Sequence, residues 1–384
     1  MQNDKIGILT STPSFFDNYG AVLQGFALQS HVKGLNYEPL TLSYRGLSEQ
    51  VRRKKANPME RFAGIFLSGN SLSQSIGTIV SKRGREARKA IFKEFVDEHI
   101  SLADELVNYE ELLRLVSEFD AFICGSDQVW NPRVHGGKND PGYFLQFAVG
   151  KVRTIAYAPS FGVSTLPEVC MENLAEYVGG IDFVSVREDS GAKLLAEYAG
   201  VEAPVVVDPT LLLTAADWDS IAMKPEWLPA RYLAVYKFGE RSEYDKLIRE
   251  TARKLGLDIV NIPAAVDPVF KTRWDIGPSE FLAIIRGAEL VCTDSFHATV
   301  FSVTYRRPCI VFPRDAPGSA KSMNSRMEGF LRRLGLKARY AAMPSEWDST
   351  LSAGFDLEDA HERLDAWRTS SKDFLNRALE GVGE

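Results

Sequence analysis

The chain has 384 residues, more than one ordinary core accommodates, so two domains are expected. Its composition, 45% hydrophobic and 25% charged with a net charge of −6, is typical of globular proteins. No uncharged apolar run approaches the roughly 18 residues that a membrane-spanning helix needs, so an integral membrane protein is not expected.

The first part of the chain alternates short apolar runs with helical patterns. It begins MQNDKIGILTST, whose apolar run of four residues is too short for a secretory signal, so we expect a cytoplasmic location. The alternation predicts a parallel sheet flanked by helices. Strands are predicted over 6–9, 119–124, 152–158, 182–186 and 204–208, and helices over 20–33, 88–98, 107–117, 168–179 and 190–199.

A strongly basic segment interrupts this first series. Residues 52–93 hold eleven Lys or Arg and two acidic residues, which gives +9 against −15 for the rest of the chain. Such an excess indicates either an anionic partner, such as a membrane surface, or a solvated helical insertion, and the sequence leaves both open. The segment has no recognisable nucleic-acid-binding motif, so we expect no nucleic-acid partner.

A proline-rich break over 200–231 separates the first series from a second one. We therefore place an N-terminal domain at 1–210, with the basic helical insertion at about 50–100, and a C-terminal domain at 211–345. Strands are predicted over 232–238, 257–262, 289–293 and 308–312, and helices over 242–255, 279–287, 295–305 and 325–334. A last predicted helix, 356–380, lies in a C-terminal helical tail, 346–384, that we expect to pack back on the first domain.

The two series predict an α/β fold with two doubly wound sheets. A single (β/α)8 barrel is the alternative, and the long insertion and the proline-rich break favour two sheets. The four cysteines form no CxxC pair and are interpreted as buried thiols in a reducing compartment. The five histidines form no HxH or HExxH motif, so we expect no metal and no organic cofactor.

Polar residues follow several predicted strands at the point where each strand ends. The sequences are TSTPSFFDNYGAVLQ after 6–9, GSDQVWNP after 119–124, PSFG after 152–158, REDS after 182–186 and DSFH after 289–293. Ligands of open parallel sheets bind outside the carboxyl ends of the strands, so we expect the site at this edge.

His297 is the candidate acid–base residue. Asp294 or Ser295 can cap the helix that follows strand 289–293, which places His297 in its first turn. A histidine there could donate a proton to, or steady, an anionic substrate. Hydrogen bonding to a neighbouring loop is an equally good interpretation from position alone.

Two further positions, one after a predicted strand and one at a predicted helix start, carry candidate anion-binding residues. Arg187 suits bidentate binding of phosphate or carboxylate, although a salt bridge to Glu188 or Asp189 is the ordinary alternative. Lys321 and Arg326 lie at the start of another predicted helix, whose N-terminus could bind an anion or be merely capped.

The loops after the first two strands offer different chemistry. Gly20 permits a close approach of backbone or ligand. Asp127, Gln128, Trp130 and Asn131 combine a carboxylate, amides and an aromatic ring, a mixture that suits hydroxyl-rich ligands. A turn whose tryptophan covers the core is the alternative.

Four motifs in order, NYGAVLQGFALQ, ICGSDQVWNP, SVRE and TDSFHATVF, resemble the polysaccharide pyruvyl transferase family over roughly residues 5–340. The resemblance implies two Rossmann-like domains in a GT-B-like arrangement with the site in the cleft. It implies transfer of pyruvate from phosphoenolpyruvate, as co-substrate, to a sugar of a polysaccharide or its lipid-linked precursor. The product would be a cyclic ketal, and phosphate would be released.

The resemblance also implies residue roles. His297 and Arg187 would serve the donor, together with Arg326 at a recurrent basic position. Ser295 and Lys321 are added as donor-binding candidates and Asp127 as a candidate base. The acceptor would bind the N-terminal domain, and the candidates are Asp17, Asn18, Tyr19, Gly20, Gln128, Trp130 and Asn131.

Two alternative functions remain open at this level. A nucleotide-sugar glycosyltransferase of the same fold is one, and a non-catalytic glycan-binding protein is another. Because such ketals are often built on lipid-linked glycans, the basic segment 52–93 is also a candidate for peripheral contact with the inner face of an anionic membrane.

Overall fold

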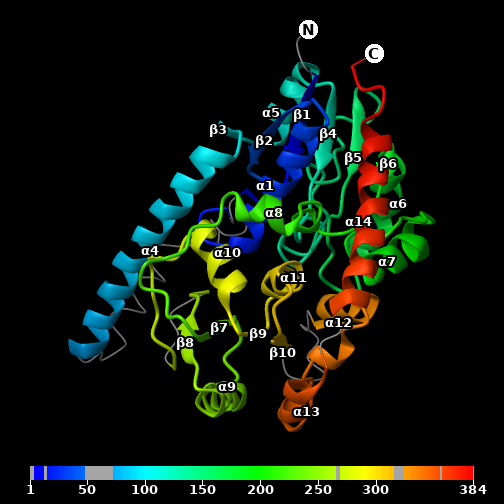
Figure 1. Cartoon of the computed structure of the whole chain (residues 1–384). Coiled ribbons are helices and arrows are strands. Elements are labelled where there is room, and N and C mark those ends of the chain that lie inside the picture. Colours follow the sequence, from blue (N-terminus) through cyan, green and yellow to red (C-terminus); the bar gives the residue numbers. More distant parts are fainter. Residues whose placement is uncertain are drawn as a thin grey trace.

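The computed structural model describes residues 4–12, 15–47, 72–264, 269–314, 324–354 and 357–383, without the side chains of 72–82, 324 and 325. Its strands form two separate sheets, in which every pairing is parallel. Figure 1 shows the first sheet near the two chain ends and the second at the opposite end of the molecule. Two open sheets exclude the single barrel for the described residues.

The first sheet has the strand order β3-β2-β1-β4-β5-β6. Its strands are β1 (Lys5–Leu9), β2 (Glu38–Tyr44), β3 (Leu102–Val107), β4 (Ala121–Cys124), β5 (Arg153–Ala156) and β6 (Phe183–Val184). β4 is buried at every residue, as expected for a strand covered on both faces. The order reverses between β1 and β4, and such switch points form ligand-binding crevices in doubly wound sheets.

The second sheet has the order β10-β9-β7-β8. Its strands are β7 (Tyr232–Tyr236), β8 (Asp258–Asn261), β9 (Leu290–Thr293) and β10 (Cys309–Val311). The order reverses between β7 and β9, which creates a second switch point. The polar DSFH sequence follows β9 at this point.

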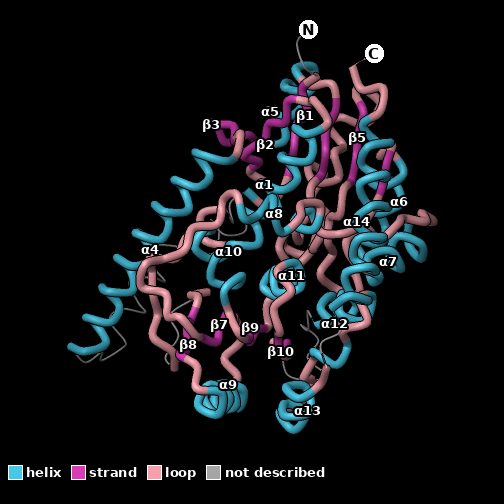
Figure 2. Tube along the Cα trace, viewed as in Figure 1, coloured by secondary structure: helices cyan, strands magenta, loops and turns pink. Residues whose placement is uncertain are grey.

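Helices surround both sheets, as Figure 2 shows. They include α1 (Tyr19–Gly34), α4 (Leu72–His99), α5 (Tyr109–Leu115), α6 (Glu168–Gly179), α7 (Asp189–Ala199), α8 (Ala215–Asp219), α9 (Ser242–Leu255), α10 (Pro278–Gly287), α11 (Phe296–Thr304), α12 (Asn324–Arg333), α13 (Trp347–Ser352) and α14 (Leu357–Leu379). α7 and α9 end at Gly200 and Gly256 with φ of 66° and 63°, which glycine adopts without Cβ strain.

Several predicted elements differ from the structure. The predicted strand 204–208 was wrong, because only a single bridge joins Val205 to Val186 there. β2 and β3 were not predicted. The predicted helix 88–98 is the end of α4, which begins at Leu72. The first part of the basic segment, 52–71, lies outside the described residues, as do the side chains of 72–82.

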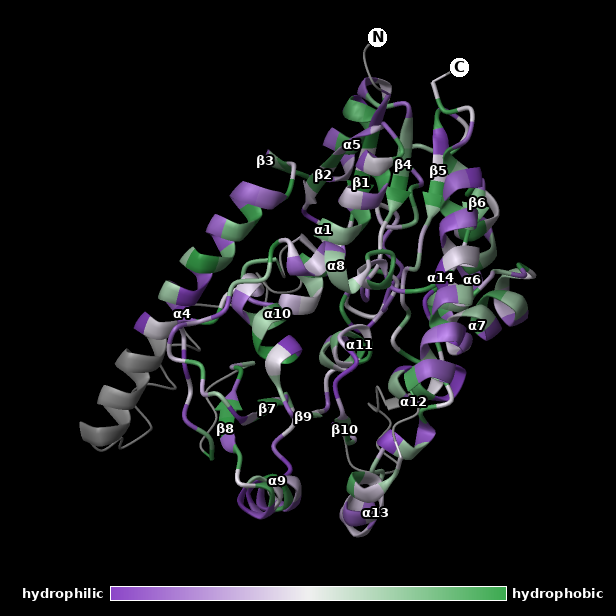
Figure 3. Cartoon of the chain, in the orientation of Figure 1, coloured by the Kyte–Doolittle hydropathy of each residue, from purple (hydrophilic) through white to green (hydrophobic). Residues whose placement is uncertain are grey.

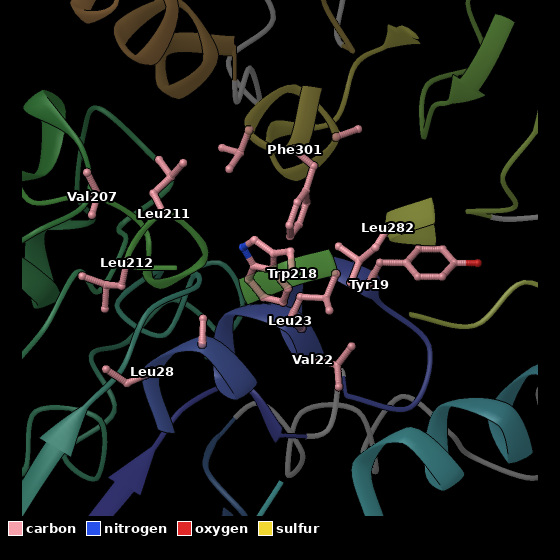
Figure 4. Packing of buried hydrophobic residues seen from close by; sticks show 14 of the residues in the cluster. Tyr19, Val22, Leu23, Leu28, Val207, Leu211, Leu212, Trp218, Leu282 and Phe301 are labelled. Atoms are coloured by element: carbon pink, nitrogen blue, oxygen red, sulfur yellow. The ribbon is translucent and has the colours of Figure 1, made fainter. Parts of the chain in front are cut away.

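A buried apolar layer joins the two sheets. Trp218 of α8 is fully buried and packs edge-on against Phe301 of α11, with ring centroids 5.0 Å apart. On its other side it meets Phe26 of α1 at 5.6 Å. Figure 4 shows Trp218 between residues of α1 and Phe301. This packing fixes how the carboxyl edges of the two sheets face each other.

α14 lies along the first sheet. The Trp367 indole donates to the Val205 carbonyl at 2.8 Å, and the Ser371 hydroxyl accepts from Val207 N–H at 3.0 Å. Figure 3 shows α14 with alternating hydrophilic and hydrophobic colours, as expected for a helix with one face against the protein. Within the described ranges, none of the helices combines the length and apolarity that crossing a membrane would need.

Candidate functional site

Two cavities lie near the carboxyl ends of the strands, and one of them lies where the switch points of the two sheets face each other. The first, the cleft cavity, has a volume of about 90 Å³ and is lined among others by Asn18, Asp127, Ser295, His297, Arg314 and Arg326. Asn18 follows β1 and Asp127 follows β4, whereas Ser295 and His297 follow β9. The cavity is therefore built by strand ends of both sheets.

His297 lies in the first turn of α11, as the sequence predicts. Ser295 is the N-cap, and its hydroxyl accepts from Ala298 N–H at 3.5 Å. The imidazole packs directly on Gly20 of α1, where an added Cβ would overlap its Nδ1, Cγ and Cε1 atoms. Gly20 thus makes room for the His297 ring, which is 13% exposed.

Asp208 is the centre of the polar cluster beside the ring. Its fully buried carboxylate accepts from the Arg187 guanidinium, with Nη1 at 2.8 Å from Oδ2. His297 Nε2 lies 3.7 Å from the same oxygen. An imidazole after β9 of the second sheet and a guanidinium after β6 of the first therefore converge on one carboxylate oxygen.

This clustering determines the charge of Asp208. Burial alone would raise its pKa, but His297 and Arg187 together hold the pKa of Asp208 well below its usual range. Burial also opposes the charge of Arg187, yet Asp208 and then Glu188 raise the Arg187 pKa. Both groups are therefore ionised at neutral pH.

Further hydrogen bonds immobilise the cluster. The Ser126 hydroxyl donates to Asp208 Oδ2 at 3.0 Å. Glu188 lies with Oε2 3.8 Å from Arg187 Nε, and its Oε1 accepts from the Ser160 hydroxyl and from two backbone N–H groups of the loop 161–162. The ordinary alternative for Arg187, a salt bridge to Glu188, is thus present at long range, while the shorter pairing is with Asp208.

Two more arginines line the cleft cavity. Burial, together with the charge of Arg187, lowers the pKa of Arg326 to about 10, so Arg326 remains a cation at neutral pH. Arg314 follows β10, and its guanidinium lies 4.2 Å from the centre of the Phe238 ring. Its Nη2 is 3.9 Å from Asp294 Oδ1, a long contact, and the Arg314 side chain is 26% exposed. The cavity can therefore offer cationic groups to an anion.

Asp294 organises the neighbouring loop. Its carboxylate accepts from Phe238 N–H at 2.9 Å and from Gly239 N–H at 2.7 Å. Burial raises its pKa despite these bonds and the nearby Arg314. Because Ser295 caps α11, the Asp294 carboxylate is available to these N–H groups. It thereby connects the end of β9 to the loop that follows β7.

A second, larger space, the side cavity, adjoins the first. It has a volume of about 330 Å³ and is lined among others by Arg187, Lys193, Asp208, Arg326, Gly329 and Trp367. Arg326 and Phe296 line both cavities. Figure 1 shows the helices that contribute to it, α7, α12 and α14, on the same side of the molecule.

The structure separates the predicted residues of the first loop. Asn18 lines the cleft cavity while its side chain caps α1. Asp17 is exposed, and its backbone carbonyl accepts from the Arg88 guanidinium at 2.9 Å. Tyr19 is fully buried, and its hydroxyl donates to the Ile276 carbonyl at 2.7 Å, so it presents no group to a ligand.

The residues of the second loop are also divided. Asp127 and Gln128 line the cleft cavity, and Asp127 has a φ of 78°, which is uncommon for a residue with a side chain. Trp130 is 1% exposed and stacks on Phe144 at 4.5 Å, so it has no free face for a sugar. Asn131 is buried and donates to Gln128 Oε1 at 2.6 Å. The alternative of a turn whose tryptophan covers the core describes Trp130.

Lys321 lies outside the described residues. Asp208 and Arg314 were missed, although both follow apolar runs, PVVVD and PCIVFPR, at the same edge where the other candidates were sought. A rule that includes every charged residue at such an edge would have found them. Among the described residues no group of three or more His, Cys, Asp or Glu side chains could hold a metal ion.

The fold has relatives among solved structures. A putative UDP-N-acetylglucosamine 2-epimerase from Listeria monocytogenes matches with a TM-score of 0.51 and 11% identity, over 100% of this chain and 96% of that one. MnaA of S. aureus in complex with UDP matches with a TM-score of 0.50 and 10% identity, over 99% and 96% of the chains. With the two parallel sheets, this likeness confirms the predicted α/β fold of two Rossmann-like units in a GT-B-like arrangement.

The sequence itself gives the more specific relationship. A comparison with curated proteins finds no match. A family model described as polysaccharide pyruvyl transferase matches residues 18–316, a range that includes the NYG, SDQ, SVRE and DSFH motifs and both switch points. The chain belongs to the polysaccharide pyruvyl transferase family.

Proposed function

We propose that the protein transfers pyruvate from phosphoenolpyruvate to two hydroxyls of a sugar, forms a cyclic ketal and releases phosphate. The observation that carries the proposal is the convergence of His297 and Arg187 on Asp208 Oδ2, at 3.7 and 2.8 Å, beside cavities lined by Arg314 and Arg326. Phosphoenolpyruvate carries a phosphate and a carboxylate, so it requires at least two cationic partners.

In this reaction one proton is added to the methylene carbon of the enol, which becomes a methyl group. One sugar hydroxyl bonds to the central carbon, and the bond from that carbon to the phosphate oxygen breaks. The second hydroxyl bonds to the same carbon and closes the ring. The two sugar hydroxyls lose one proton each. One of these protons restores the acid that protonated the methylene carbon, and the other leaves with phosphate or passes to water.

His297 is the proposed general acid and base. Its ring nitrogen Nε2 is buried beside Asp208 and makes no hydrogen bond within the described part of the chain, and it is the atom proposed to exchange a proton with a substrate. The Asp208 carboxylate lies beside this nitrogen, at 3.7 Å, and is proposed to hold the orientation of the ring. Asp127, at the wall of the same cavity, is the proposed base for an acceptor hydroxyl.

Three arginines are proposed to bind phosphoenolpyruvate. Arg326 and Arg314 line the cleft cavity and are the proposed partners of its anionic groups. Arg187 acts from the side cavity, but its pairing with Asp208 reduces the charge that it can offer to a ligand. Ser295 and, by its sequence position, Lys321 complete the proposed donor set. No metal or organic cofactor is required by this scheme.

The experiment is to incubate the protein with phosphoenolpyruvate and a panel of glycans, and to measure phosphate release and the methyl signal of the ketal by NMR. His297→Ala should lower turnover by about 10²–10⁴-fold without loss of fold. His31→Ala, on α1 and outside both cavities, is the matched control and should keep full turnover. A second arm with nucleotide sugars tests for a glycosyltransferase, which would release nucleotide and leave phosphoenolpyruvate unchanged.

We also propose that the enzyme acts at the inner face of an anionic membrane, on a lipid-linked acceptor. The +9 charge of 52–93 supports this proposal. The described part of that segment carries exposed Arg83, Arg85 and Lys89 on α4, which lies at the margin of the molecule in Figure 1.

A further inference from the structure

The side cavity is large enough for a ligand that the cleft cavity cannot hold. Its volume is about 330 Å³ against about 90 Å³. Binding sites for small molecules typically begin near 300 Å³. A small acid such as phosphoenolpyruvate therefore leaves no room in the cleft cavity for a sugar ring, whereas the side cavity has that room.

The lining of the side cavity suits an uncharged, hydroxyl-rich molecule. Several of its charges are paired with each other: Arg187 binds Asp208 and lies 3.8 Å from Glu188, and Asp189 binds both Arg332 and Arg333 at 2.9 and 2.8 Å. A polyanion would have to break these pairs. Paired planar groups still offer free donors and acceptors to hydroxyls, which is the chemistry that recognises sugars.

An apolar wall completes this chemistry. Trp367 of α14 and Phe330 of α12 both line the cavity, and their ring centroids are 6.4 Å apart. The Trp367 N–H is already bound to Val205, and the Arg333 guanidinium lies 4.6 Å from the centre of the ring, so the ring contributes packing area beside Arg333 and no further hydrogen bond. Lys193 and Glu197 of α7, with opposite charges, lie exposed in the lining. An aromatic wall beside polar groups is typical of hexose binding.

The side cavity also reaches the candidate catalytic groups. Arg326 and Phe296 belong to both cavities, and Asp208 lines the side cavity while His297 beside it lines the cleft cavity. A hydroxyl at this junction would therefore lie next to the donor.

We propose that the hexose acceptor binds in the side cavity, between α7, α12 and α14, with its reacting hydroxyls at the junction formed by Arg326 and Asp208. This inference rests on the proposed function. It moves the acceptor away from the loops around 17–20 and 127–131, where the sequence predicted it, because Tyr19, Trp130 and Asn131 are committed to the core. It also makes the C-terminal helix α14 part of the site.

Gly329 gives a clean way to fill the cavity. It lies on α12 in the lining, and among the described residues a Cβ added there would meet a single atom within 4 Å, Asp189 Oδ2 at 3.8 Å. Leucine is also a better helix former than glycine, so Gly329→Leu should fold. Gly179→Leu, at the end of α6 where a Cβ meets nothing within 4 Å, is the matched control.

The measurement is steady-state kinetics with p-nitrophenyl hexosides as acceptors. Gly329→Leu should raise the acceptor KM by about tenfold or more and leave the KM for phosphoenolpyruvate unchanged, because the added side chain occupies the acceptor's space. Gly179→Leu should match the wild type in both constants. An unchanged acceptor KM in Gly329→Leu, or a loss confined to the donor KM, would overturn the inference.

Saturation-transfer NMR with the same hexosides separates this inference from the proposed function. Binding by the wild type that is lost in Gly329→Leu supports the side cavity as a sugar site even if no hexoside is pyruvylated. In that case only the proposed reaction fails. Binding that persists in Gly329→Leu, or a wild type that binds no hexoside, contradicts the side cavity as the acceptor site.

Discussion

Asp208 shows how a single residue can hold two functional side chains. It is fully buried and accepts from Arg187 and Ser126, with His297 Nε2 3.7 Å away. A buried cation without its partner is costly, so removal of the Asp208 charge should affect the whole fold. The same charge orients the groups on which the proposed chemistry depends.

Asp208→Asn should therefore lower the free energy of unfolding by about 3–5 kcal/mol. Chemical denaturation at pH 7 measures this loss. The double variant with Arg187→Met should lose less, because it leaves no unpaired guanidinium in the core. Asp208→Asn as stable as the wild type would show that the pairing contributes nothing to the fold.

The pH dependence of the same loss has a definite sign. His297 and Arg187 hold the pKa of Asp208 below its usual range, so its stabilising contribution is complete above the unfolded pKa of about 3.9. The contribution disappears as the pH falls toward the lower folded pKa. The difference in free energy of unfolding between the wild type and Asp208→Asn should therefore stay constant above about pH 4 and become smaller below it.

Gly20 is a positioning residue, because the His297 ring occupies the space where a side chain would be. Gly20→Ala should displace the ring and lower turnover by about tenfold or more, since small misplacements of a catalytic group reduce its efficiency strongly. Gly34→Ala, at the other end of the same helix with nothing within 4 Å of its Cβ, should keep wild-type turnover. Both changes favour the helix, so a melting curve checks that any loss in Gly20→Ala is local. Wild-type turnover in Gly20→Ala would refute the positioning role.

At the scale of elements, the start of α1 connects the two sheets. The Tyr19 ring stacks on Phe281 of α10 with centroids 4.7 Å apart and meets Tyr236 of β7 edge-on at 5.6 Å. Arg88 of α4 covers the same ring at 4.7 Å. The NYG motif, predicted to bind a ligand, thus places Asn18 at the cavity, Tyr19 in the interface and Gly20 beneath His297.

The sequence predicted most elements because apolar runs and helical periods are local signals. β3 was not predicted because it is an edge strand. Its residues Glu105 and Leu106 are exposed, so its sequence contains no continuous apolar run. The run PVVVD was read as a strand on the same criterion, yet its backbone pairs with Val186 alone, just past the end of β6, while Val205 and Val207 bond to side chains of α14. Apolar runs report burial and do not reveal which partner buries them.

For the candidate site, the sequence predicted the edge of the sheets but not which side chains face a cavity. The edge on which His297, Arg187, Arg326, Asp127 and Gln128 meet follows from the position of each after a strand or at a helix start. Which side chains face a cavity depends on packing between distant segments, and the sequence contains no local signal for it. Trp130 is an example, because its ring packs against Phe144 and Phe161 in the core and does not face either cavity.

At the scale of the whole molecule, charge is unevenly distributed, with +9 in 52–93 and −15 elsewhere. If this asymmetry serves a membrane surface, the protein should cosediment with anionic vesicles at low salt and be released at high salt, because screening weakens the attraction. Each Lys or Arg near such a surface contributes about 1 kcal/mol, so reversing the exposed pair Arg85→Glu and Lys89→Glu on α4 should weaken binding by more than about tenfold. Lys246→Glu and Lys254→Glu on α9 make the same change in net charge away from the basic segment and should bind better than the α4 variant. Equal binding of the two variants would assign the attraction to net charge alone, and no binding at low salt would leave the segment as a solvated insertion.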